Sequence, residues 1–150
     1  MDEARAEGRA RRVDAAHHPI AAILLPVPII CFVGALATDL AYDSSGGNLL
    51  WVNFSSWLLA TGLVFGAILI LLMLIDFARL PQLRSGDGWA GFALLVAAWM
   101  VEFINSLVHA RDGWTAVVPL GLILSAIGAL QVLTVGWLWH EARYDVGERR

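Results

Sequence analysis

Four long apolar stretches dominate this sequence, and they constrain its fold more than any other feature. They cover residues 20–40, 54–77, 89–108 and 115–139, and each has about the 20 residues that a helix needs to cross the hydrocarbon core of a bilayer. A helix satisfies all of its own backbone hydrogen bonds within one segment, which lipid requires. Hydrophobic residues make up 59% of the chain. We therefore predict an all-α integral membrane protein.

Short polar connections separate the four stretches. They cover residues 43–53, 81–88 and 110–113 and are rich in Gly, Ser, Asn and Asp. Links this short place consecutive helices side by side and in opposite directions, which predicts a four-helix bundle of up-down-up-down topology. The chain then divides into an Arg-rich segment at 1–17, a four-helix membrane domain at 18–141 and a tail at 142–150.

The arginines predict the orientation of the bundle. Four precede the first helix, two lie between the second and third, and three follow the fourth, whereas the other two connections contain only Arg111. Because basic residues are retained on the cytoplasmic side, we expect both termini in the cytoplasm, and we place the protein in a bacterial inner membrane.

The first apolar stretch has a second interpretation, a cleaved signal peptide, because it follows arginines and contains Ala35-Leu36-Ala37. Its length and the prolines Pro26 and Pro28 argue against that interpretation. Each proline lacks a backbone donor, so we expect a kink or a late start in this helix.

Imidazoles and carboxylates gather where the helices are predicted to meet the cytoplasm. His18 precedes the first helix, Asp76 ends the second, and His140 and Glu141 end the fourth. These groups are the ligands that a divalent metal or a b-type haem would need. The alternative is that the carboxylates pair with arginines and the histidines lie at the interface. His18 and His109 cannot share one haem, because they lie at opposite membrane faces.

A stripe of polar side chains follows the third helix. Glu102, Asn105 and His109 recur at intervals of three and four, which places them on one face toward the bundle interior. An ionisable group at this depth is costly unless it is paired, protonated or hydrated. We expect a neutral Glu102, with Gln131 of the fourth helix as its nearest candidate partner. A proton or solute path through Glu102 and His109 is the alternative.

An ion pair is predicted near the periplasmic face. Asp39 ends the first helix, and both His109 and Arg111 lie at the same depth. Of the two, we assign Arg111 as the partner of Asp39.

Small residues recur at spacings of three or four in several helices, among them Gly62 with Gly66 and Gly121 with Ser125 and Gly128. This pattern allows close approach of backbones within the bundle or between protomers.

Three motifs in order resemble the bacterial membrane proteins called domain of unknown function 2231. The first helix resembles that family's HPxHPxLxPxPI opening, the second shares its Trp, internal Gly and closing Asp, and the end is similar to GWLGGELVYxxG. The matching residues are His18-Pro19-Ile20, Leu25-Pro26-Val27-Pro28-Ile29, Asp39-Leu40, Trp57, Gly62, Asp76, Gly136-Trp137-Leu138, Glu141, Tyr144 and Gly147.

The resemblance implies a four-helix membrane fold without an established activity, in a family whose relatives are fused to or encoded beside Rieske or cytochrome-type modules. At two places the sequence departs from the family's motifs, and both bear on a ligand role that the resemblance would assign to histidines. Ala21-Ala22 stand where the family has its second His-Pro, and Trp139-His140 stand where it has Gly-Gly.

Together these features favour a non-catalytic accessory or scaffold subunit of a membrane complex, which needs no cofactor and associates with lipid and with other membrane subunits or itself. The alternatives are a redox-associated anchor with haem b or a divalent metal at the cytoplasmic cluster, and a small-solute or proton transporter. No nucleotide-binding, metalloprotease or serine-hydrolase motif is present, and no basic stripe suggests nucleic acid.

Overall fold

A computed structural model describes residues 19–80, 87–111 and 117–148, with side chains over residues 20–80, 88–111 and 117–140. Its elements are α2 (Pro19–Leu24), α3 (Pro26–Ser44), α4 (Leu49–Arg79), α5 (Asp87–His109), the short π-type segment η3 (Val117–Gly121) and α6 (Leu122–Glu148). Four candidate membrane spans result, Ile20–Ser44, Leu49–Arg79, Gly88–His109 and Val117–His140. The predicted all-α architecture of four apolar helices is therefore confirmed.

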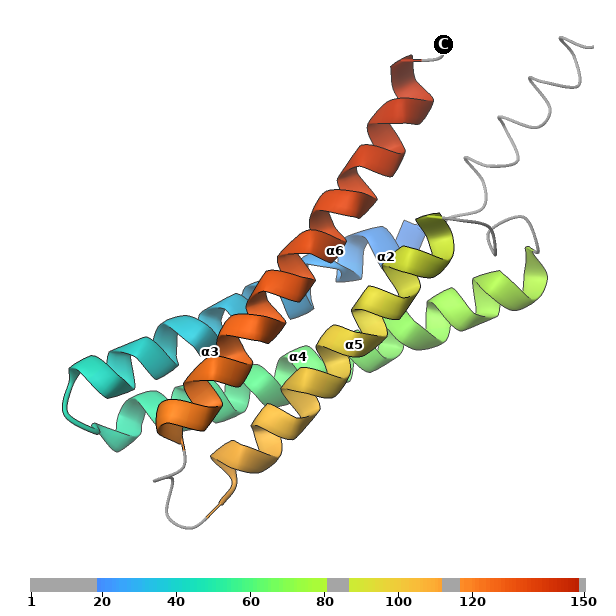
Figure 1. Cartoon of the computed structure of the whole chain (residues 1–150). Coiled ribbons are helices and arrows are strands. Elements are labelled where there is room, and N and C mark those ends of the chain that lie inside the picture. The colour runs from blue at the N-terminus through green and yellow to red at the C-terminus, as the bar shows by residue number, and fades with distance from the viewer. Residues whose placement is uncertain (1–18, 81–86, 112–116, 149–150) are drawn as a thin grey trace, which may run out of the picture.

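The helices form a closed ring in which neighbours along the chain are neighbours in space. α3 packs on α4, α4 on α5 and α5 on α6, and α6 returns to α3. Successive helices run in opposite directions, and α6 extends past the other helices at its C-terminal end (Figure 1). The ring encloses one interior that all four helices line.

Glycines and an asparagine set the connection between α3 and α4. Gly46 and Gly47 have φ angles of 71° and 90°, which residues with a Cβ rarely adopt. The Asn48 side chain then caps α4 by accepting a hydrogen bond from the backbone N–H of Leu50 at 3.1 Å. This compact turn lets α3 continue to Ser44 and α4 begin at Leu49, so both helices extend beyond the predicted spans.

The first span is interrupted once, directly before Pro26, whereas Pro28 lies inside α3 and the late start is not observed. Residues Pro19–Leu24 and Pro26–Ser44 are separate helices with Leu25 between them. Leu25 keeps helical angles, φ −53° and ψ −40°, and its N–H still bonds to the carbonyl of Ala21 at 2.9 Å. The interruption is therefore a local loss of hydrogen bonds caused by nitrogens without hydrogen.

Glycines of the bundle receive bulky side chains from the facing helices. A Cβ placed on Gly62 would lie 2.8 Å from Cδ1 of Phe32, and one on Gly66 would lie 2.9 Å from Cδ1 of Trp99. Trp99 also donates from Nε1 to the backbone carbonyl of Leu63 at 2.9 Å. The small-residue pattern thus marks notches that large side chains fill inside this bundle.

The outward faces of the helices are apolar. Ile23, Trp57 and Leu130 are 73%, 70% and 68% exposed. Exposing such side chains to water would be costly. Lipid tails are as apolar as these side chains, so exposure to lipid carries no such cost. The interior contains both apolar and polar side chains. Its apolar part is a buried cluster formed by Phe32, Ala35, Leu59 and Val132, and the polar part is described next.

Candidate functional site

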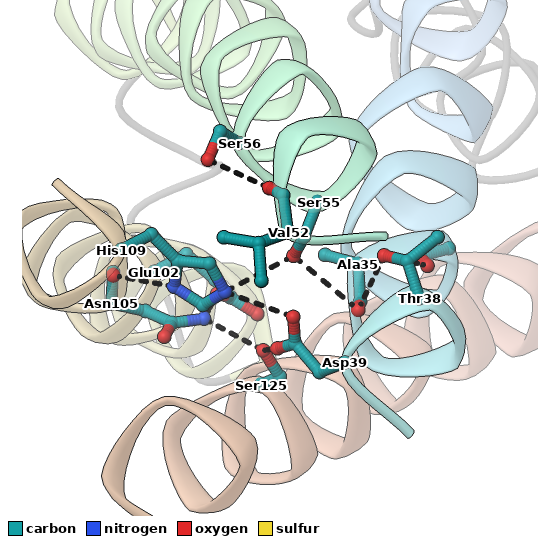
Figure 2. A network of polar contacts seen from close by, with 11 residues as sticks. Ala35, Thr38, Asp39, Val52, Ser55, Ser56, Glu102, Asn105, His109 and Ser125 are labelled. Atoms are coloured by element: carbon teal, nitrogen blue, oxygen red, sulfur yellow. Dashed lines mark hydrogen bonds and ion pairs between the residues drawn. The ribbon is translucent and has the colours of Figure 1, made fainter. Parts of the chain in front are cut away.

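A buried cluster of polar side chains joins all four helices near the connection between α3 and α4. No member of it is more than 1% exposed, and Figure 2 shows the side chains converging in the space between the helices. Its members are Asp39 of α3, Ser55 of α4, Glu102, Asn105 and His109 of α5, and Ser125 of α6.

His109 lies at the centre of this cluster and uses both of its ring nitrogens. Nδ1 lies 3.0 Å from the backbone carbonyl of Asn105, and because a carbonyl only accepts, Nδ1 carries a hydrogen and donates it. Nε2 lies 2.9 Å from Oδ1 of Asp39. A proton must lie between these two atoms, so the pair is either an imidazolium facing a carboxylate or a neutral pair.

Both oxygens of Asp39 have partners. Oδ1 faces His109, and Oδ2 accepts a hydrogen bond from Oγ of Ser125 at 2.5 Å. This arrangement replaces the predicted ion pair between Asp39 and Arg111. Arg111 follows the end of α5 and is exposed, whereas Asp39 points into the bundle, where the imidazole one helix away satisfies it.

Asn105 links the two carboxyl groups of the cluster. Its Nδ2 donates to Oε2 of Glu102 and to Oγ of Ser125, both at 2.8 Å. Since the Ser125 hydroxyl donates its hydrogen bond to Asp39, its oxygen acts as the acceptor for Asn105. The amide orientation is therefore fixed by its neighbours, with both amide hydrogens used and Oδ1 left as an acceptor.

Glu102 lies against the backbone of α6 in a notch at Gly128. A Cβ on Gly128 would lie 2.5 Å from Cδ and 2.7 Å from Cγ of Glu102. The hydrogen-bond partner of Glu102 is Asn105 rather than the predicted Gln131. Among the described residues, Oε1 of Glu102 and Oε1 of Gln131 are both buried without a hydrogen-bond partner. Helix periodicity explains the difference, because Asn105 lies one turn from Glu102 on the same helix.

The cluster contains Ser, His and Asp without the arrangement of a hydrolase triad. Ser55 Oγ lies 3.2 Å from Nε2 of His109, and Asp39 contacts the same nitrogen. In a triad the carboxylate holds Nδ1 and leaves Nε2 to activate the serine. Here Nδ1 is held by a carbonyl, so Asp39 competes with Ser55 for one nitrogen. Serine activation of the triad type does not follow from this geometry.

Two of the four side chains of the predicted cytoplasmic cluster lie outside the described ones. His18 precedes them, and the side chain of Glu141 is not described; Asp76 is buried and His140 is exposed. Among the side chains that the structure does describe, no group of three His, Cys, Asp or Glu could hold a metal. The metal or haem site at this end therefore stays a prediction.

Two members of the polar cluster were not among the predicted site residues. In the sequence pattern Ser125 appears only as a small residue, and Ser55 belongs to none of the predicted sites. The signal for Ser55 was present, because it lies between Val52 and Leu59 in a stripe at helical spacing that is buried along α4. A serine within a buried stripe in lipid needs an internal partner, and the Ser55 hydroxyl also lies 3.5 Å from the backbone carbonyl of Ala35.

Comparison with known proteins agrees with the resemblance seen in the sequence motifs. The family described as "Predicted membrane protein (DUF2231)" matches residues 17–148. No curated protein and no solved structure matches the chain.

Proposed function

The chain belongs to the DUF2231 family of predicted membrane proteins, and from this premise we propose that it is a non-catalytic membrane subunit, an accessory or scaffold element of a larger membrane complex. The bilayer surrounds its four apolar helices, and its partners are other membrane subunits or a second copy of itself. The arginine distribution supports an inner-membrane protein with both termini in the cytoplasm.

One observation carries this proposal, which is that the buried polar cluster uses most of its hydrogen-bonding groups internally. Asp39 and His109 each use both polar atoms on neighbours within the bundle. Ser125 and Asn105 connect α6 and α5 to that pair. In lipid, where helices gain little from apolar contact, such bonds hold helices in one arrangement. A cluster used in this way supports a structural role.

The same geometry argues against proton transport along the cluster. Asn105 lies between Glu102 and Ser125, and its amide nitrogen donates one hydrogen to each of them. An amide nitrogen cannot accept a proton from one side and release it to the other as a hydroxyl, carboxyl or imidazole can. The Asp39–His109 pair and Glu102 are therefore two separate proton-binding sites.

Gentle purification from the native membrane tests the proposal. We expect the protein to elute with other subunits, or as an oligomer, at constant stoichiometry through two successive chromatographic steps. The same sample is measured by oxidised and dithionite-reduced absorption spectra and by elemental analysis. A colourless, metal-free stoichiometric complex supports an accessory subunit. A cofactor-free monomer would contradict it.

The spectrum also decides the redox-anchor alternative. A Soret band or a stoichiometric metal that disappears in His18→Ala and His140→Ala would establish the cytoplasmic cluster as a cofactor site. Each variant must keep the helical circular dichroism spectrum of the wild type, so that loss of the band or metal reports loss of a ligand and not of the fold.

A further inference from the structure

Three buried oxygen atoms of the interior are not used by the hydrogen-bonded cluster. They are Oε1 of Glu102, Oδ1 of Asn105 and Oε1 of Gln131, and none has a partner among the described residues. All three are acceptors. Burying an acceptor without a donor is costly, so three together in a membrane interior call for a positively polarised partner.

The three oxygens belong to one stretch of the interface between α5 and α6. Asn105 holds the Glu102 carboxyl group through its amide nitrogen at 2.8 Å, so the two side chains lie together. Glu102 Oε1 is pressed against α6 at Gly128. Gln131 follows Gly128 by three residues and therefore lies on the same face of α6, one turn along.

The charges of the surrounding groups indicate what that partner is. The titratable groups of this interior are Asp39 on α3 and Glu102 and His109 on α5. α4 contributes Ser55, and α6 contributes Ser125 and Gln131. Asp39 and His109 neutralise each other as a pair. Glu102 is then the one carboxyl group of this interior without a basic partner, and when it is ionised its buried charge requires a compensating charge of equal size.

We propose that Glu102, Asn105 and Gln131 form a binding site for one small monovalent cation, Na⁺, between α5 and α6. A carboxylate and two amide oxygens are hard ligands of the kind that alkali and alkaline-earth ions prefer. One carboxylate matches one positive charge, which favours a monovalent over a divalent ion. This site is independent of the scaffold role proposed above.

Protons compete with Na⁺ for the same carboxylate. Protonation of Glu102 neutralises it and gives Oε1 a hydrogen, which Oδ1 of Asn105 can accept. The ion therefore binds only after this proton leaves. We expect the apparent affinity for Na⁺ to fall by about tenfold per pH unit below the titration of Glu102, as one proton is exchanged for one ion.

Thermal unfolding of the purified full-length protein in detergent tests the site, with NaCl replaced by choline chloride at constant ionic strength. We expect the midpoint to rise with Na⁺ concentration and to saturate, because an ion that binds only the folded state stabilises it. Glu102→Gln keeps the shape and removes the charge, and it should lower Na⁺ affinity by about 100-fold or more. Infrared spectra should show loss of the Glu102 carboxylic acid band as Na⁺ is added.

Two further variants keep the test decisive if Glu102→Gln does not fold. Gln131→Leu removes one oxygen outside the hydrogen-bonded cluster and should weaken Na⁺ binding by about tenfold. Thr134→Val is the matched control on α6, because its hydroxyl bonds only to the carbonyl of Leu130 in its own helix. Equal unfolding midpoints in Na⁺ and choline from acid to alkaline pH would mean that Glu102 takes only a proton, and would overturn the proposal.

Discussion

Replacement of Gly128 by alanine tests most directly how tightly the polar cluster is packed. The new Cβ would lie 2.5 Å from Cδ and 2.7 Å from Cγ of Glu102, far inside van der Waals contact. Overpacking of this kind costs about 1–3 kcal/mol. Displacing the carboxyl group also loses its bond to Asn105, about 1.5–3 kcal/mol for a charged partner. Better helix propensity returns about 1 kcal/mol.

The expected net destabilisation is therefore about 1.5–5 kcal/mol, combining these contributions. Reversible unfolding in mixed micelles with increasing dodecyl sulfate, followed by circular dichroism, measures it. Gly91→Ala is the control, because a Cβ on Gly91 meets nothing within 4 Å. That variant should be neutral or more stable by about 0.5–1 kcal/mol.

A double variant identifies the cause of the destabilisation. In Glu102→Ala the side chain that blocks the new methyl group is absent, so Gly128→Ala should cost at least about 1 kcal/mol less there than in the wild type. If Gly128→Ala is as stable as Gly91→Ala, or if its cost is unchanged in the Glu102→Ala background, the described packing of Glu102 against α6 is wrong.

Three further substitutions are predicted from the same contacts, each measured by the same unfolding assay. Asp39→Asn should cost about 3–5 kcal/mol, because it breaks a buried acid–base pair. The exposed Arg111→Ala should change the free energy of unfolding by no more than about 0.5 kcal/mol. A large effect at Arg111 would restore the ion pair predicted from sequence. Ser125→Ala should cost about 1–3 kcal/mol, because it loses two hydrogen bonds to other helices. In the control Ser56→Ala, the lost hydroxyl bonds only within its own helix, so the free energy of unfolding should hardly change. Equal effects of the two variants would argue against a cluster that joins helices. Trp99→Phe should lose about 1 kcal/mol with its bond to a backbone carbonyl of α4, and an unchanged midpoint would show that this bond is not formed.

The ends of the helices were predicted less well than their existence. The second helix was expected from residue 54 and begins at Leu49. Residues 49–52 are Leu-Leu-Trp-Val, so the apolar pattern already begins at Leu49 and the predicted connection, drawn to Asn53, was too long. The Gly46-Gly47 turn and the Asn48 cap are local signals that set the true boundary, because a cap satisfies a backbone donor of the first helical turn.

The candidate site was predicted along one helix and missed between helices. Glu102, Asn105 and His109 could be placed on one face because the helical period relates them. Which groups face them from α3, α4 and α6 depends on the rotation and depth of those helices. His109 and Arg111 were equally near Asp39 in sequence-based depth, and only the direction of each side chain distinguishes them.

The sequence by itself determined that this chain is a four-helix membrane protein, because lipid offers the backbone no hydrogen-bond partner and every apolar stretch must therefore become a helix. Tertiary structure alone decided that Asp39, Ser55 and Ser125 meet the third-helix stripe, and that Glu102 lies at Gly128 instead of pairing with Gln131. Apolar pattern is a property of each helix separately. The pairing of buried polar groups is a property of how the helices pack against one another, and no single helix contains that information.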